Sequence, residues 1–295
     1  MNASRVAVIA DSTCYLPAGW AAEWGIQIVP VQVIVAGQPH DETEDAQAQR
    51  VAEALAAWQP VTTSRPSPAR FLQAYAAAME TGATELVVAT LSASMSATYE
   101  SATLAAKEVD VPVRVVDSRT IAMGLGFAVM SGARAARAGA DADHVARAVE
   151  ERAAAASVFF YVDTLEYLRR GGRVSSARAV VGHALKVKPL LRVVDGHVVP
   201  LEQVRTAGRA LARLADLAVE AAGDDEVEIA VQHLGSPDRA ATLAASLRTR
   251  LPGMNVVECA VGGVVGAHVG PGMVAAIVAP VLPSSGPPTM PGDDG

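Results

Sequence analysis

The stretch SPARFLQAYAAAMETGATELVVATLSAS, residues 67–94, contains a helix pattern followed at once by a strand pattern. Ser67 is suited to cap a helix, and Pro68 fits the first helical position. One face of the predicted helix then carries the apolar residues Phe71, Tyr75 and Met79. The short run Glu85–Leu91 contains β-branched residues and predicts a strand. This order of elements indicates an α/β fold.

The same alternation continues along the chain. SPDRAATLAASLRTRL, residues 236–251, repeats the Ser-Pro start and carries its own apolar stripe. Short β-branched runs predict further strands at Arg5–Ala10, Gln27–Val35, Val113–Val116, Val158–Val162, Val227–Gln232, Asn255–Cys259 and Val274–Ala279. Strands that alternate with helices through the whole length predict α/β architecture with largely parallel sheets.

The pattern changes in the middle of the chain, where the helices become shorter. There KPLLRVVDGHVVPLEQV, residues 188–204, predicts a β-hairpin that turns at Asp195–Gly196. We therefore expect an N-terminal α/β domain over residues 1–155 and a C-terminal α/β domain over residues 156–281. The tail, residues 282–295, is rich in Pro, Gly and Ser and is predicted to be disordered.

Composition excludes several classes of protein. The formal net charge is −7 and no basic stripe is present, which argues against a nucleic-acid partner. The N-terminus lacks the apolar segment of a signal peptide, and no run of about 18 apolar residues predicts a membrane span. We expect a soluble cytoplasmic protein in which Cys14 and Cys259 are reduced thiols. Aromatic residues are only 4% of the chain, so its alanine-rich core has room for long, thin cavities.

Polar clusters follow several predicted strands. In parallel α/β sheets ligands bind at the carboxyl ends of strands, where helices begin. The clusters are Ala10–Thr13, Val61–Ser67, Leu91–Ala102, Tyr167–Ser175 and the lone His268 within GVVGAHVGPGMV, residues 263–274. Ordinary helix capping explains any one hydroxyl cluster, and a core histidine bonded to a carbonyl explains His268. Two helix N-termini that carry hydroxyls together favour a site for a carboxylate or a phosphate.

Common catalytic and nucleotide motifs are missing from these clusters. The sequence contains no G-x-x-x-x-G-K-[ST], no G-x-G-x-x-G after the first strand and no G-x-S-x-G. Asp117 and Ser118 are expected to cap a helix, and Asp163 to cap the short helix at Thr164–Arg169. His197 is expected to be exposed beside the hairpin turn. Two histidines have no partner that the sequence identifies, His183 and His233.

Taken in order, these segments resemble the DegV family of bacterial fatty-acid-binding proteins. They are ADST followed by LP (10–17), TTSRPS (62–67), LSASMSATYESA (91–102), VVDS (115–118), DTLEYLRRGGRVS (163–175), LKVKPLL before DGH (185–197), QVR (203–205) and GAHVGPG (266–272). The resemblance implies two α/β domains with a tunnel between them that holds one long-chain fatty acid such as palmitate. It implies no cofactor and no chemistry of the protein's own.

The resemblance also implies roles for single residues. Thr63, with Ser64, and Ser96 match the positions that hold the carboxylate, and His268 matches a histidine close to this head group. Arg173 and Arg205 match arginines near the mouth of the site. Proteins of this kind present the acid to a separate fatty acid kinase, which supplies the ATP site and makes an acyl phosphate for phospholipid synthesis.

Three positions depart from the family pattern. The family's S-G-T is Ser96-Ala97-Thr98 here, so the loop must accept a Cβ at position 97. Arg65 replaces a glutamine beside the expected head group, and Val269 replaces a threonine after His268. Two other functions are alternatives: an acyl-ester hydrolase that uses Ser96 or Ser64 with His268, or a sensor whose lipid is only structural.

Overall fold

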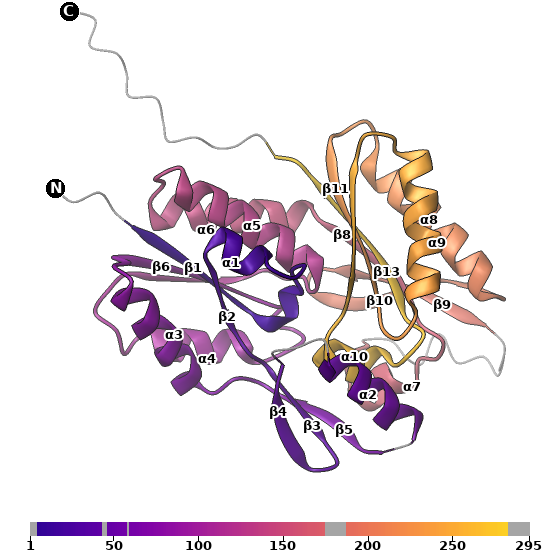
Figure 1. Ribbon diagram of the computed structural model, residues 1–295, viewed down its shortest axis with the longest axis horizontal. Helices are drawn as coiled ribbons and strands as arrows, with labels where there is room; N and C mark the ends of the chain where they lie inside the picture. The colour runs from indigo at the N-terminus through magenta and orange to yellow at the C-terminus, as the bar shows by residue number, and fades with distance from the viewer. Residues whose placement is uncertain (1–4, 43–45, 58, 175–186, 283–295) are drawn as a thin grey trace, which may run out of the picture.

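The computed structural model describes residues 5–42, 46–57, 59–174 and 187–282. Two main sheets alternate with helices in five layers, with one pair of helices between the sheets and one pair on each outer side (Figure 1). The α/β fold predicted from the sequence is confirmed. The predicted tail lies outside the described residues, apart from Leu282.

The first main sheet has the order β2-β1-β6-β7, and its strands are all parallel. Its strands are β1 (Val6–Asp11), β2 (Ile26–Val29), β6 (Glu85–Thr90) and β7 (Val113–Asp117). On one face lie α3 (Pro68–Glu80) and α4 (Thr98–Ala106), and on the other α5 (Met123–Arg137) and α6 (Ala142–Ala155). A 3-10 turn, η1 (Ser12–Cys14), and a short helix, α1 (Trp20–Trp24), join β1 to β2. We call these elements, with the small sheet described next, the first lobe.

The predicted strand Gln27–Val35 is wrong as a single element, because the structure divides it at Pro30. Proline has no N–H to donate, so the parallel ladder ends there. The chain continues as β3 in a separate antiparallel sheet with the order β4-β3-β5. This small sheet and its helix comprise β3 (Gln32–Val35), β4 (Gln38–Asp41), β5 (Val61–Ser64) and α2 (Ala46–Ala56).

The second main sheet has the order β10-β9-β8-β13-β11-β12 and forms the second lobe. Its strands are β8 (Ser157–Tyr161), β9 (Lys188–Val194), β10 (His197–Val204), β11 (Val227–His233), β12 (Asn255–Ala260) and β13 (Val274–Pro280). Its helices are α7 (Glu166–Arg170), α8 (Ala207–Ala222), α9 (Pro237–Arg250) and α10 (Gly263–Val269). Among the described strands of this sheet, β11 and β12 pair in parallel and the other neighbours are antiparallel. The expectation of largely parallel sheets therefore holds for the first main sheet alone.

The hairpin predicted at Asp195–Gly196 is confirmed and helps to make the second sheet mixed. Both turn residues have positive φ, 49° and 80°, as a tight turn between antiparallel strands requires. The turn also docks on the first lobe, where Ser92 Oγ donates to the Gly196 carbonyl over 2.8 Å. A Cβ at position 196 would lie only 2.5 Å from Ser92 Oγ, so glycine is needed here for space as well as for its positive φ.

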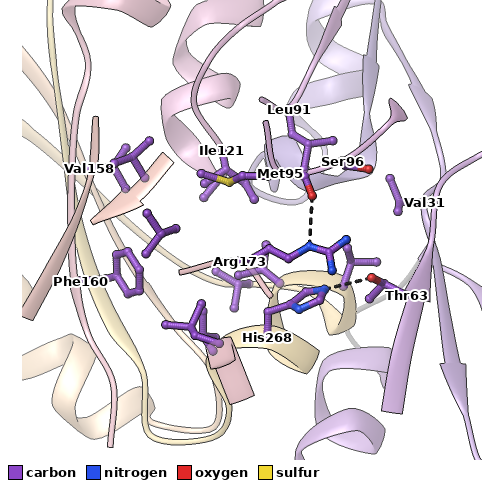
Figure 2. Close-up of a pocket in the computed structure, with 18 of the residues that line it drawn as sticks. Val31, Thr63, Leu91, Met95, Ser96, Ile121, Val158, Phe160, Arg173 and His268 are labelled. Atoms are coloured by element: carbon purple, nitrogen blue, oxygen red, sulfur yellow. Dashed lines mark hydrogen bonds between the residues drawn. The ribbon is translucent and has the colours of Figure 1, made fainter. Parts of the chain in front are cut away.

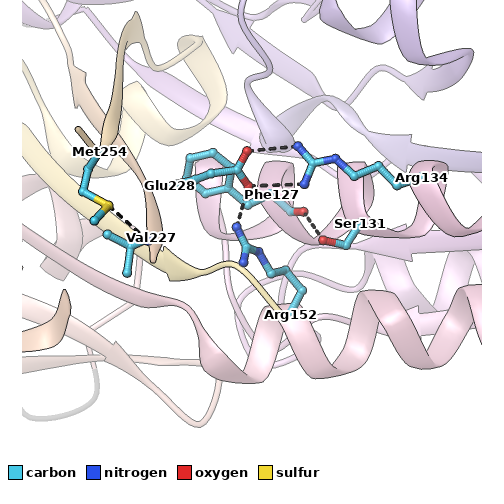
Figure 3. Close-up of polar contacts among 7 residues, drawn as sticks. All are labelled: Phe127, Ser131, Arg134, Arg152, Val227, Glu228 and Met254. Atoms are coloured by element: carbon cyan, nitrogen blue, oxygen red, sulfur yellow. Dashed lines mark hydrogen bonds and ion pairs between the residues drawn. The ribbon is translucent and has the colours of Figure 1, made fainter. Parts of the chain in front are cut away.

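Two ion pairs join the lobes where α5 and α6 meet β11, and the arginine of one of them is buried (Figure 3). Arg152, whose side chain is only 1% exposed, donates to Glu228 over 2.5 Å. Arg134 reaches the other oxygen of this carboxylate over 3.0 Å, and the Phe127 ring lies beside the Arg152 guanidinium. One carboxylate of the second lobe is therefore shared by two arginines of the first.

Candidate functional site

An apolar cavity of about 250 Å³ lies between the lobes. Most of its wall is aliphatic, with Thr63 and Ser96 on one side and Val158 and Phe160 on the opposite side (Figure 2). The apolar lining residues are Val31, Leu91, Met95, Ala97, Ile121, Ala122, Val158, Phe160, Leu168, Val193, Val198, Val261, Val264, Val265, Val269, Met273 and Ala275. The polar lining residues are Thr63, Ser64, Arg65, Ser96, Arg173, Gln232 and His268. The cavity therefore suits a molecule with a long apolar part and a small polar end.

His268 and Thr63 form the centre of the polar end. Thr63 lies on β5 and His268 in the last turn of α10, and a hydrogen bond of 2.9 Å joins Thr63 Oγ1 to His268 Nε2. Burial lowers the pKa of His268 to about 4, and the charge of Arg173 contributes in the same direction. The imidazole is therefore neutral at pH 7. It is a polar group beside the cavity that carries no charge of its own.

The other ring nitrogen of His268 lies against the loop after α7. Nδ1 is buried and has no hydrogen-bond partner among the described residues. A Cβ at Gly171 would lie 2.2 Å from this atom. Gly171 has an ordinary φ of −71°, so the need for glycine here is one of space and not of backbone conformation.

Arg173 lies at the polar end, close to His268 and Thr63 (Figure 2). Its Nε donates to the Met95 carbonyl over 3.2 Å, and its Nη1 donates to the Gly171 carbonyl. The side chain is exposed to solvent although it lines the cavity. A positive charge therefore lies at the polar end and is accessible to solvent.

Hydroxyls complete this end of the cavity. Ser96 precedes α4, and its Oγ is joined to Thr98 Oγ1 by a hydrogen bond of 2.9 Å. Ser64 ends β5, and its Oγ donates to the Arg65 carbonyl over 3.4 Å. Of the six residues predicted for the site, five therefore line one cavity. Arg205 does not; it is exposed just after β10.

The sequence predicted hydroxyl groups at the N-termini of two helices, but the structure places most of them elsewhere. Thr63 and Ser64 belong to a strand, and Ser67, the N-cap residue of α3, is exposed and makes no capping bond through its side chain. The expectation holds only for Ser96, which lies two residues before the first residue of α4. Sequence reasoning misplaced the others because β5 pairs with β3, a contact that local patterns do not reveal.

The departures at positions 97 and 269 fit their surroundings. Ala97 has a φ of −77°, so the loop needs no left-handed residue and a Cβ is accepted without strain. Val269 is buried and lines the cavity, so it adds apolar surface at a position where the family pattern has a threonine hydroxyl. Arg65 also lines the cavity and adds a second arginine to its polar end.

Other residues singled out in the sequence are structural. The capping role predicted for Asp117 and Ser118 is wrong, because the next helix, α5, has Ala122 as its N-cap residue and no side-chain cap. Asp117 instead accepts hydrogen bonds from the amides of Ala93 and Arg119 in the surrounding loops. His197 is exposed as predicted. The role predicted for Asp163 is wrong: it does not cap α7 but pairs with Lys188 at 2.6 Å and Arg239 at 3.4 Å. These partners lie on β9 and α9, and nothing in the sequence indicates that either element lies near Asp163.

His233, Cys14 and Cys259 do not line the cavity. His233 has a partner after all, because its Nδ1 accepts from the Ser236 amide over 3.3 Å. His183 and Ser175 lie outside the described residues. Neither cysteine forms a disulfide within the described residues, and Cys259 Sγ accepts a hydrogen bond from Gln232 Nε2 over 3.3 Å. Burial raises the pKa of Cys14 to about 12.

Two buried polar residues were not predicted. Gln232 lines the cavity, and its Oε1 accepts from the Met123 amide at the start of α5. A lone glutamine in the apolar run of β11 was the available signal. Glu42 is also buried, yet its acidic neighbours in HDETED gave no hint of this. Burial raises the pKa of Glu42 to about 7.

Two kinds of feature were searched for within the described ranges. No group of three or more His, Cys, Asp or Glu side chains there is placed to hold a metal ion. Likewise, none of the helices in the part of the chain that the structure describes is long and apolar enough to cross a membrane.

Comparison with known proteins identifies the family. The model of the DegV family, described as an uncharacterised protein family, matches residues 5–281. A DegV domain-containing protein of Streptomyces coelicolor is 47% identical over 275 residues, which cover 93% of this chain and 98% of that protein.

Solved structures agree with this match. A DegV family protein from Thermus thermophilus, described by its fatty acid binding, superposes with a TM-score of 0.87 at 27% identity and covers 94% of this chain and 100% of its own. A fatty acid binding DegV family protein from Streptococcus agalactiae gives 0.86 at 26% identity, with coverages of 95% and 100%. The chain described here belongs to the DegV family.

Proposed function

We propose that this protein binds one long-chain fatty acid in the cavity between its lobes. The carboxylate lies among Thr63, Ser64, Ser96 and His268, and the acyl chain extends toward Val158 and Phe160. The observation that carries this proposal is the polarity of the cavity, which is aliphatic along its length and has hydroxyls, a neutral imidazole and an arginine at one end. The fatty acid binding described for relatives of the same family supports it.

The energetics of such a ligand fit this division. Burying a C16 chain contributes about 12 kcal/mol, at about 0.8 kcal/mol per methylene, before the costs of association and ordering. A carboxylate removed from water costs several kcal/mol unless donors surround it. The hydroxyl of Ser96 and the guanidinium of Arg173 supply such donors. When the one N–H of neutral His268 is on Nε2 it donates to Thr63 Oγ1, which leaves the Thr63 hydroxyl to donate to the carboxylate without a second buried charge.

The proposal extends to a partner that carries out the chemistry. We propose that the bound acid is presented to a separate fatty acid kinase, which converts it to an acyl phosphate. A further cavity of about 460 Å³ shares Thr63, Arg173 and His268 with the acyl cavity and is lined by Arg170 as well. It supports a route by which a phosphoryl group reaches the carboxylate, and exposed Arg173 is suited to neutralise the product. Exposed Arg205 is proposed to contact the kinase.

A hydrolase finds no support in this geometry. The hydroxyl bonded to His268 belongs to Thr63, whereas the serines proposed as nucleophiles bond elsewhere. In a Ser-His-acid arrangement the second ring nitrogen donates to a carboxylate, but Nδ1 of His268 has no partner among the described residues. The geometry therefore favours a fatty-acid-binding protein over a hydrolase.

Native mass spectrometry of the purified protein tests the ligand. We expect a mass increment of one long-chain fatty acid, which is lost or reduced when Thr63→Val is combined with Ser96→Ala. Ser94→Ala, at an exposed serine of the same loop, is the control and should retain the acid. A wild-type protein without any acyl ligand, and without affinity for added palmitate, would refute the proposed function. Acyl phosphate formation with a fatty acid kinase, impaired in Arg173→Ala, tests the partner.

A further inference from the structure

The helix that carries His268 is capped by the other lobe. The N-cap residue of α10 is Gly262, which has no side chain to satisfy the first amides of the helix. The Val264 amide instead donates to Glu42 Oε1 over 2.7 Å, and the Val265 amide donates to the Tyr15 hydroxyl over 3.1 Å. Tyr15 in turn donates to the same oxygen of Glu42 over 3.0 Å. Two side chains of the first lobe therefore replace a cap of the helix's own.

Glu42 is held as a dedicated acceptor. It is only 6% exposed, and its second oxygen accepts from Ser12 Oγ over 2.7 Å, while Ser12 Oγ itself accepts from the Val31 amide. Gly262 allows the carboxylate to approach, because a Cβ there would lie 2.2 Å from Glu42 Oε1. A buried carboxylate is costly unless its hydrogen bonds are complete, and these bonds come from η1, its C-cap residue and α10.

α10 depends on such external support. Its sequence, GVVGAHV, has two glycines in seven residues, and short glycine-containing helices are weak on their own. Val264 and His268 are four residues apart, so they share one face, and both line the acyl cavity. A shift of the first turn is therefore transmitted to the imidazole that meets Thr63.

We propose that Glu42, assisted by Tyr15, is a positioning residue for His268, through its hydrogen bonds to the first turn of α10. It holds the imidazole at Thr63 only while the lobes are docked. The geometric part of this proposal concerns the free protein, and its effect on ligand affinity rests on the proposed function.

Histidine ring NMR of the ligand-free protein tests the geometric part. The His268 signal is assigned by its disappearance in His268→Ala. We expect Glu42→Ala to shift this signal, Glu42→Gln to restore it because its amide oxygen still accepts from Val264, and Glu258→Ala to leave it unchanged. Glu258 is the matched control, because it lines the same surface hollow as Glu42 but pairs with Arg248. An unshifted signal in Glu42→Ala would overturn the proposal. Tyr15→Phe replaces that variant if it fails to fold.

A double-mutant cycle tests the effect on the ligand, with palmitate titrated into delipidated protein. Loss of a helix cap corresponds to roughly fivefold weaker binding, which we expect for Glu42→Ala in the wild-type background. In the His268→Ala background the same change should have almost no effect, since it acts through the imidazole. An equal loss in both backgrounds would show a general structural role and overturn the proposal. If wild-type protein does not bind palmitate, the proposed function fails, and the NMR result alone decides the positioning role.

Discussion

The two ends of the cavity between the lobes are built in different ways. Val158 and Phe160 lie side by side on β8, where a six-stranded sheet fixes both. The polar end is assembled from both lobes, with Thr63 on β5, Ser96 before α4 and His268 on α10. The apolar end is thus a property of one sheet, whereas the polar end exists only where the lobes meet. Selection of the chain and capture of the head group should therefore respond differently to mutation.

The largest expected effect comes from breaking the contact that brings the lobes together. Glu228→Ala leaves Arg152 buried without its partner, and such a loss costs about 3–5 kcal/mol. We expect urea unfolding to show this decrease in the free energy of unfolding. Glu220→Ala, at an exposed partner of Arg213, should change it by less than about 1 kcal/mol. Equal effects of the two substitutions would show that the buried cluster does not hold the lobes together.

The second prediction is that stability depends on pH through Glu42, which supports the polar end. Burial raises the pKa of Glu42 from 4.5 to about 7, and the charge of Asp11 adds to the rise. A carboxyl group whose pKa is higher in the folded protein stabilises it fully below about pH 4.5, and this contribution is lost as the pH rises through 7. The shift corresponds to about 3 kcal/mol. The scaffold of the polar end should therefore weaken between pH 5 and pH 8.

Urea unfolding of wild type and Glu42→Gln at several pH values checks this. The stability of wild type relative to the variant should fall by up to that amount between pH 5 and pH 8. His268 is present in both proteins, so its own loss of stability, which occurs as the pH falls below 6.5 because burial lowers its pKa to about 4, cancels in the difference. A difference that is independent of pH would contradict the prediction.

A mutation at the apolar end should change only the length of fatty acid that binds best. Val158→Phe extends into the cavity at the side opposite Thr63, so a long acid loses contact there while its carboxylate keeps its donors. Each methylene kept out of the cavity costs about 0.8 kcal/mol, which is about fourfold in affinity. Titration with acids of increasing length should show a shorter optimum than in wild type. An unchanged optimum would mean that the chain does not reach β8.

Much of the polar end could be predicted from the sequence because its residues sit in short segments with recognisable order. Thr63, Ser64, Ser96, Arg173 and His268 all line one cavity, as the resemblance implied. The α/β fold followed from local periodicity, which reports the burial of one face and needs no long-range contact.

Most of the failures share one physical cause, which is partners distant in the chain. Asp163 was predicted to cap α7 but pairs with Lys188 of β9. The division of Gln27–Val35 has a local cause, because Pro30 cannot donate to the ladder and the chain enters another sheet after it. Glu42 could not be distinguished from its solvated neighbours, because its burial depends on a helix more than two hundred residues later. The order of strands in the second lobe depends likewise on pairings between segments far apart.

The smallest expected effect lies at Ala97, where the polar end departs from the family pattern. Its φ of −77° is ordinary for any residue, so Ala97→Gly should change the free energy of unfolding by only a few tenths of a kcal/mol. Palmitate affinity should stay at the wild-type value. Gly171→Ala makes the opposite exchange at the same end, where the new Cβ meets His268 Nδ1 at 2.2 Å, and affinity should fall. Gly208→Ala, in open space on α8, is the control for adding a methyl group. If Ala97→Gly and Gly171→Ala alter binding equally, the polar end is governed by loop flexibility and not by the position of the imidazole.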